Sequence, residues 1–121
     1  TNVRITNNYF NVIGSGDNIT NSATPTVQNL IITGNQIQQN GDTGIAINLG
    51  TDVVVADNIV FDCDNSAIAL SGTIRFVVAN NLVQNDQSTL QAAMSINSVA
   101  GTIDYGIVAN NFLRAGANWL R

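Results

Sequence analysis

One short pattern occurs five times along the chain. Each copy has an apolar residue three positions before an Asn, a Gly, Asn or Asp directly before that Asn, and an apolar residue two positions after it. The five copies are residues 3–10, 30–37, 53–60, 76–83 and 106–113. A repeat of this kind predicts a solenoid, because each unit buries its apolar face only by stacking on its neighbours.

The spacing of the copies predicts a coil of about 23 residues. The shared Asn occupies positions 8, 35, 58, 81 and 111, so successive copies are 27, 23, 23 and 30 residues apart. The residues three and five positions before the Asn share one face of a strand, since strand side chains alternate with a period of two. A third short strand is expected about ten residues after the Asn, at 45–47 and 68–70, with weaker matches at 19–20 and 94–96.

The residues around the shared Asn predict a corner. Gly, Asn and Asp adopt positive φ more readily than other residues, and the expected bends are at Asn7, Gly34, Asp57, Asn80 and Asn110. Coils of a parallel solenoid are about 4.8 Å apart, so amides at equal positions can hydrogen-bond along the stack. We therefore expect an asparagine ladder made of Asn8, Asn35, Asn58, Asn81 and Asn111.

The amino-acid composition favours strands joined by tight turns, and it excludes several kinds of catalytic and metal-binding site. The 121 residues include 19 Asn, 14 Ile, 12 Val and 11 Thr, which favours an all-β fold. There is no His, Lys or Glu and only one Cys, Cys63, flanked by two Asp residues that disfavour its thiolate. We therefore expect no His-based catalysis, no metal or other cofactor, and no internal disulfide. A net charge of −4 with four scattered Arg predicts no nucleic-acid binding, and apolar runs no longer than residues 53–56 predict no membrane insertion.

The repeat, its period and its Asn corner resemble the right-handed parallel β-helix of the pectin-lyase-like superfamily, and most of all a β-helix segment of a phage tailspike. The resemblance implies an all-β, right-handed parallel β-helix of about five coils over residues 1–113, followed by a C-terminal tail or cap at 114–121. We also expect a fragment of a longer chain, since the sequence begins at Thr1 and shows no capping helix. The superfamily contains enzymes, adhesins and tailspikes, so the fold leaves the function open.

Two columns that should face away from the core are largely apolar. They include Ile31, Val54, Val77 and Ile107 before the corner, and Tyr9, Ile59, Leu82 and Phe112 after it. Monomers rarely expose so large an apolar patch, so we expect a partner to cover it. A parallel homotrimer is the first choice, as in tailspikes, and a flanking loop or another part of a parent chain is the alternative.

The catalytic candidates are acidic residues between the second and third strands of the coils: Asp42, Asp62, Asp64 and Asp86. Pairs on adjacent coils, such as Asp42 with Asp64, would lie about 5 Å apart, the separation that retaining glycosidases use. Asp also serves as a backbone acceptor in turns, and a weak Ca²⁺ site is a further possibility. A lyase would have to use Arg, Tyr9 or Tyr105 as its base, which is less favoured.

Glycan binding without turnover needs a shallow face with amides and an aromatic residue. The candidates are Gln39, Asn48, Phe61, Asn65 and Gln84. Together these features predict a structural module of a trimeric virion spike that binds a polysaccharide or cell-surface glycan, located on the virion surface or outside the cell. The alternative is a polysaccharide-degrading enzyme, an Asp-based glycoside hydrolase or, less favoured, a lyase.

Overall fold

The computed structural model describes residues 2–11, 15–21, 26–38, 41–85, 92–97, 105–115 and 118–120, and these residues form strands and turns with no helix. The strands make three sheets, each with one strand from every repeat. Sheet A contains β1 (Val3–Thr6), β4 (Val27–Thr33), β7 (Gly50–Ala56), β10 (Ile74–Ala79) and β13 (Gly106–Ala109). Sheet B contains β2 (Tyr9–Asn11), β5 (Gln36–Gln38), β8 (Ile59–Phe61), β11 (Leu82–Asn85) and β14 (Phe112–Ala115). Sheet C contains β3 (Ile19–Thr20), β6 (Ile45–Asn48), β9 (Ile68–Ser71), β12 (Ala92–Asn97) and β15 (Asn118–Leu120).

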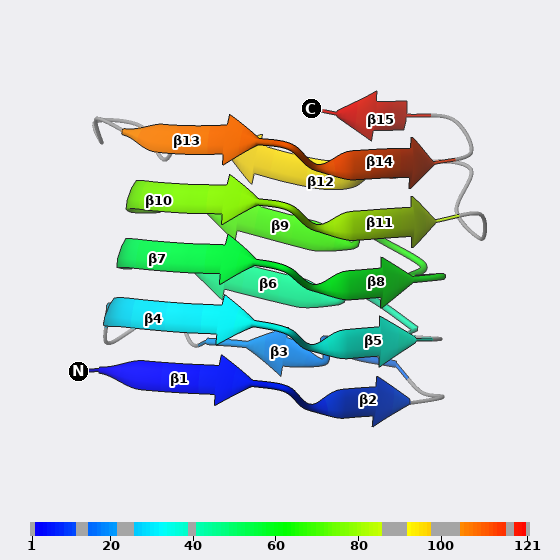
Figure 1. Ribbon diagram of the computed structural model, residues 1–121, viewed down its shortest axis with the longest axis horizontal. Helices are drawn as coiled ribbons and strands as arrows, with labels where there is room; N and C mark the ends of the chain where they lie inside the picture. Colours follow the sequence, from blue (N-terminus) through cyan, green and yellow to red (C-terminus); the bar gives the residue numbers. More distant parts are fainter. Residues whose placement is uncertain are drawn as a thin grey trace.

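The chain winds as a right-handed coil. Figure 1 shows sheets A and B side by side at the front, with sheet C behind them and each coil stacked above the previous one. Neighbouring strands are parallel, and their register follows the sequence repeat: Leu30 pairs with Val53, and Val53 pairs with Phe76. The predicted right-handed parallel β-helix with a 23-residue repeat is therefore confirmed.

The core consists of the inward-facing residues of the three sheets. Alternation places Ile32, Val55 and Val78 inside from sheet A, each with no exposed surface. The largest fully buried side chains of the other two sheets are Ile37, Val60 and Val83 from sheet B, and Ile45, Ile47, Ile68, Leu70 and Met94 from sheet C. Burying one such side chain contributes about 1.5–3 kcal/mol, so the stability of the core is the sum of contributions from the stacked coils.

The predicted corner has the predicted backbone. Asn7, Asp57, Asn80 and Asn110 have φ between 54° and 57°, and Gly34 has φ of 67°. A left-handed residue at this position turns the chain from sheet A into sheet B within two residues. The next residue, the shared Asn, is thereby directed inward, and Asn35, Asn58 and Asn81 are almost completely buried.

Hydrogen bonds join the buried Asn side chains from coil to coil. Asn58 Oδ1 accepts from the backbone N and Nδ2 of Asn35, at 3.0 and 3.1 Å. Asn58 Nδ2 donates to Asn81 Oδ1 and to the carbonyl oxygen of Ile32, both at 3.0 Å. The same bonds to Oδ1 link Asn8 to Asn35 and Asn81 to Asn111. The asparagine ladder is confirmed, and it pairs amide groups that would otherwise be costly to bury.

The C-terminal residues continue the β-helix. Beyond residue 113, where the sequence predicts a C-terminal tail or cap, β14 continues through Ala115, and β15 pairs with β12 through Ala92 with Asn118 and Met94 with Leu120. Residues 118–120 thus supply the third strand of the last coil. The sequence of this segment does not resemble the third strand of the other coils. It can still pair with β12, because parallel strand pairing uses backbone groups and does not require a particular sequence.

Replacing Asn58 by Leu tests the ladder. Asn58→Leu leaves the amide of Asn35, Asn81 Oδ1 and the Ile32 carbonyl short of partners, and each buried group left unpaired costs about 1–3 kcal/mol. We expect a clear fall in the free energy of unfolding, measured by urea denaturation. The control is Asn8→Leu, at the exposed start of the same column, which should cost much less. Equal losses would contradict the ladder's role in stability.

Candidate functional site

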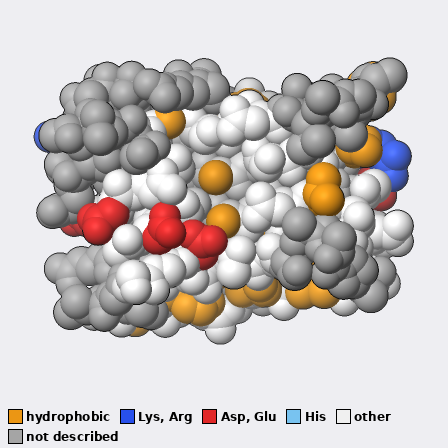
Figure 2. Space-filling view, turned by 180° about the vertical axis from the view of Figure 1, so that it is seen from behind, with side chains coloured by type: hydrophobic (Ala, Val, Ile, Leu, Met, Phe, Trp, Pro, Cys, Tyr) orange, Lys and Arg blue, Asp and Glu red, His pale blue; other side chains and the backbone are white. Residues whose placement is uncertain are grey.

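The acidic candidates lie where sheet B passes into sheet C. Figure 2, the view from behind, shows acidic side chains close together at one edge of this face. Asp62 directly follows β8 and has a left-handed backbone with φ of 55°, while Asp64 is exposed. Asp86 lies outside the described residues. Their use in catalysis stays a prediction.

The register between coils gives the acidic residues specific neighbours. Ile45 pairs with Ile68, so Asp42 lies beside Asn65, and Asn65 Nδ2 donates to Asp42 Oδ1 at 3.0 Å. Asp17, one coil earlier, accepts from the backbone N of Thr43 at 3.1 Å. These two carboxylates therefore act as acceptors that join adjacent turns, a common structural use of Asp.

Asp42, Asp62 and Asp64 are here called the acidic edge, and Cys63 is buried beside them. Burial raises the pKa of its thiol from 9.0 to about 12, with smaller upward contributions from the charges of Asp62, Asp64 and Asp42. A hydrogen bond with the backbone of Gly44 opposes this shift. From the sequence, the charges of the flanking Asp residues were the expected reason for the unfavourable thiolate. In the structure, removal of the thiol from water raises its pKa more than those charges do. Cys63 is thus a small core residue and a poor nucleophile.

The predicted glycan-contacting residues that the structure describes lie on sheet B, on sheet C and in the turn between these sheets. Phe61 lies on the outer face of sheet B, with Gln38 and Gln84 as its neighbours on the adjacent coils. Asn48 lies at the end of β6 in sheet C, and its backbone N donates to Asn21 Oδ1 at 2.7 Å. The remaining candidates are Asn65, which is bonded to Asp42, and Gln39, which lies outside the described residues.

The predicted apolar stripe is divided between two sheets with different surroundings. On sheet B the outward row contains Tyr9 and Phe112, exposed by 59% and 62%, and Ile59 and Leu82, each exposed by 37%. On sheet A the outward residues Ile31, Val54, Val77 and Ile107 line a groove. The sheet B row is therefore an exposed apolar surface, and the sheet A row, in which Ile107 is 59% exposed, lines one side of a groove.

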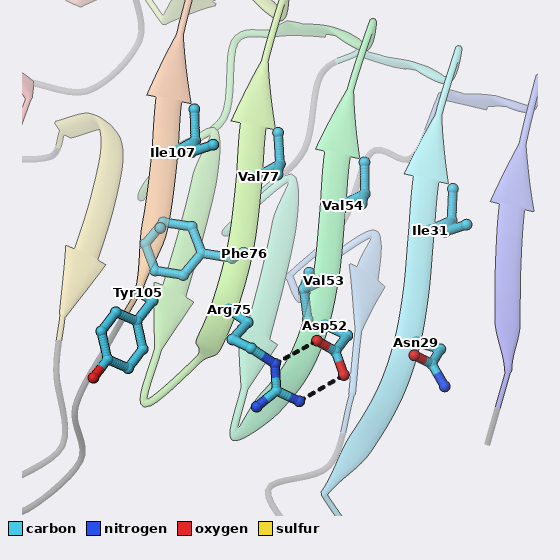
Figure 3. A pocket seen from close by; sticks show the side chains of 11 residues that line it. Asn29, Ile31, Asp52, Val53, Val54, Arg75, Phe76, Val77, Tyr105 and Ile107 are labelled. Atoms are coloured by element: carbon cyan, nitrogen blue, oxygen red, sulfur yellow. Dashed lines mark hydrogen bonds and ion pairs between the residues drawn. The ribbon is translucent and has the colours of Figure 1, made fainter.

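The groove on sheet A has a volume of about 810 Å³ and crosses four coils. Figure 3 shows two rows of side chains across the strands, an apolar row of Ile31, Val54, Val77 and Ile107 and a more polar row of Asn29, Asp52, Arg75 and Tyr105. Val53 and Phe76 lie between the rows. Gly106 belongs to the inward column of Phe76, and any side chain there would overlap the Phe76 ring, so this Gly leaves room for the ring beside the groove.

The polar row is the part of the site that the sequence analysis missed. Asn29, Asp52 and Arg75 directly precede the first apolar residue of their repeats, and Tyr105 precedes Gly106 at the same position of the last repeat. Asn29, Asp52 and Arg75 all have positive φ, at 51°, 57° and 53°. Extending the repeat by one residue toward the N-terminus would have found them. A left-handed backbone is uncommon outside Gly and Asn, and its recurrence on three coils bends the strands at the groove.

Asp52 and Arg75 form an exposed bidentate ion pair on adjacent coils. Arg75 Nε donates to Asp52 Oδ1 at 2.6 Å and Nη2 donates to Oδ2 at 2.8 Å. These hydrogen bonds hold the pKa of Asp52 below its ordinary value and raise the pKa of Arg75. Exposed pairs contribute little stability, so the chief effect is to fix both planar groups beside the groove.

A family model described as "Right handed beta helix region" matches residues 1–119. The chain belongs to the right-handed beta helix family. Neither curated proteins nor solved structures gave a match. Within the described ranges, this family member has no helix long and apolar enough to cross a membrane and no cluster of three or more potential metal-ligating Cys, Asp, Glu or His residues.

The raised pKa of Cys63 predicts a loss of stability at alkaline pH. The folded thiol stays protonated to about pH 12, while the unfolded thiol ionises near pH 9.0. Stability from the neutral thiol is therefore complete below pH 9 and falls as the pH rises toward 12. Urea denaturation at about pH 8 and about pH 10.5 should show a larger loss for the parent than for Cys63→Ala. Equal losses would mean that the thiol is not the cause.

Proposed function

We propose that this β-helix is a non-catalytic structural module that assembles through sheet B into the homotrimeric spike of a virion or an extracellular appendage and binds a glycan. The observation that carries the proposal is the exposed row of Tyr9, Ile59, Leu82 and Phe112. The row crosses adjacent strands in register and is continuous apart from Gln36. Ordinary monomer surfaces tolerate single apolar residues but seldom a row of this length.

A closed ring of identical chains suits such a surface. The coils are stacked at one strand spacing, so residues on the same face of parallel copies have the same axial period. A cyclic assembly would cover the row on every chain at once. Phe61 adds a further aromatic side chain to the same sheet face, next to Gln38 and Gln84. This face therefore combines apolar area with amides, as interface centres and rims do.

Polysaccharide hydrolysis is the second candidate. It is favoured by the proximity of Asp42, Asp62 and Asp64, which all act electrostatically on Cys63. Against it, Asp42 already accepts a hydrogen bond from Asn65 as part of a turn. A hydrolase needs one protonated and one ionised carboxyl group on either side of the scissile bond.

Light scattering tests the assembly. The parent should have the mass of a trimer at micromolar concentration, whereas Ile59→Asp with Leu82→Asp should be monomeric, because two adjacent charges would be buried in the interface. Ala69→Asp with Ser95→Asp adds the same charge on adjacent coils of sheet C and should leave the mass unchanged. A folded parent that stays monomeric at all concentrations would contradict the proposed assembly.

A reducing-end assay on polysaccharides distinguishes the second candidate. We expect no sugar release by the parent, and equal behaviour of Asp62→Asn with Asp64→Asn. Turnover that the parent shows and this double variant loses, with binding retained, would establish the hydrolase instead. Circular dichroism of both proteins provides the control for folding.

A further inference from the structure

The groove on sheet A has the form of a binding site. Its volume of about 810 Å³ is within the range of pockets that hold small ligands. It crosses four coils, so the rows on its sides extend over about 14 Å at one strand spacing per coil. An elongated ligand parallel to the axis of the β-helix would fit this shape.

The two sides of the groove offer different contacts. One side is the aliphatic row of Ile31, Val54, Val77 and Ile107. The other side offers an amide, a carboxylate, a guanidinium group and a phenol ring from Asn29, Asp52, Arg75 and Tyr105. Tyr105 is 64% exposed, so its ring is accessible for stacking. A suitable ligand has one apolar face and hydroxyl groups along one edge.

The charges of the lining favour a neutral ligand. Asp52 and Arg75 are its charged residues, and together they sum to zero. Two of the guanidinium nitrogens donate to Asp52, so Arg75 is partly neutralised toward a ligand anion. A hydroxyl group both donates and accepts, and can therefore bind the carboxylate and the guanidinium group of the pair together.

We propose that this groove binds a neutral oligosaccharide whose chain is parallel to the β-helix axis. The C–H faces of the sugar rings pack on the aliphatic row and on Tyr105, and ring hydroxyls bond to the Asp52–Arg75 pair and to Asn29. The proposal rests on the glycan-binding part of the proposed function. It assigns that part to sheet A, away from the acidic edge and from Phe61.

Other elongated ligands fit less well. An extended peptide binds a sheet by hydrogen bonds to a free strand edge, but here the groove crosses strands whose backbone groups pair with each other. An acyl chain would stay partly in water in an open groove beside an ion pair. A polyuronate would meet a carboxylate at the groove and a chain of net charge −4.

Isothermal titration of the parent and its variants tests the site. The probes are neutral glucan, mannan and galactan oligomers of two to six sugars, together with oligogalacturonate, a proline-free hexapeptide and decanoate. At least one neutral series should bind. Its affinity should rise with the number of sugars and stop rising at about three or four sugars, when the groove is filled. Tyr105→Ala and Arg75→Ala should each weaken binding about tenfold or more, through lost stacking and lost charge-assisted hydrogen bonds.

Two further variants make the test specific. Asp52→Asn removes the carboxylate and leaves Arg75 with an unbalanced positive charge, so binding of the neutral oligomer should fall while oligogalacturonate gains affinity. Phe61→Ala removes the aromatic side chain of the competing candidate site on sheet B, so neutral binding that survives this substitution assigns the sugar to sheet A. All four substitutions are at surface positions, and circular dichroism confirms that each variant is folded.

The outcomes separate this proposal from the proposed function. Neutral binding that is lost in Phe61→Ala but kept in Tyr105→Ala and Arg75→Ala would overturn the groove site and leave glycan binding on sheet B. Absence of neutral binding, or binding of the peptide or decanoate instead, would overturn the oligosaccharide proposal. The mass of the parent in solution decides the assembly independently of both results.

Discussion

Hydrogen bonding between coils is the interaction on which the rest of this structure depends. The backbone pairs strand with strand in all three sheets, and the Asn amides pair coil with coil at the corner between sheets A and B. A buried amide is costly unless its donors and acceptor are paired. Each ladder Asn therefore needs the Asn of the next coil, and the corner keeps the same geometry where the spacing grows from 23 to 30 residues.

This constraint decides where function can reside. Inward strand positions are mostly apolar, the inward Asn at the corner must be paired, and the residue before it must allow a left-handed backbone, so the outward columns are the ones free to vary. Because coils stack in register, an outward column becomes a row of side chains across the sheet. The exposed row on sheet B and the two rows along the groove on sheet A are both products of this geometry.

The Asp52–Arg75 pair illustrates the difference between stability and recognition. The pair is exposed, and both residues have left-handed backbones, which is unfavourable for Arg in particular. Its contribution to stability is small for these reasons. A fixed pair of planar polar groups opposite an aliphatic row is better explained as a contact for a ligand, which is the basis of the oligosaccharide proposal.

The sequence by itself determined the coil. The spacing of the Asn residues, the left-handed residue types before them and the alternating apolar positions predicted the strands, the corner, the ladder and the register, because these features follow from local backbone preference and repetition. The third strand of the last coil was missed, since Asn118–Leu120 pair through backbone groups that any sequence supplies. Tertiary structure alone decided which outward residues form an open apolar surface and which line a groove. That distinction depends on the left-handed backbone at Asn29, Asp52 and Arg75 and on the ion pair between Asp52 and Arg75 of adjacent coils. The alternation of apolar and polar residues along one strand predicts neither feature.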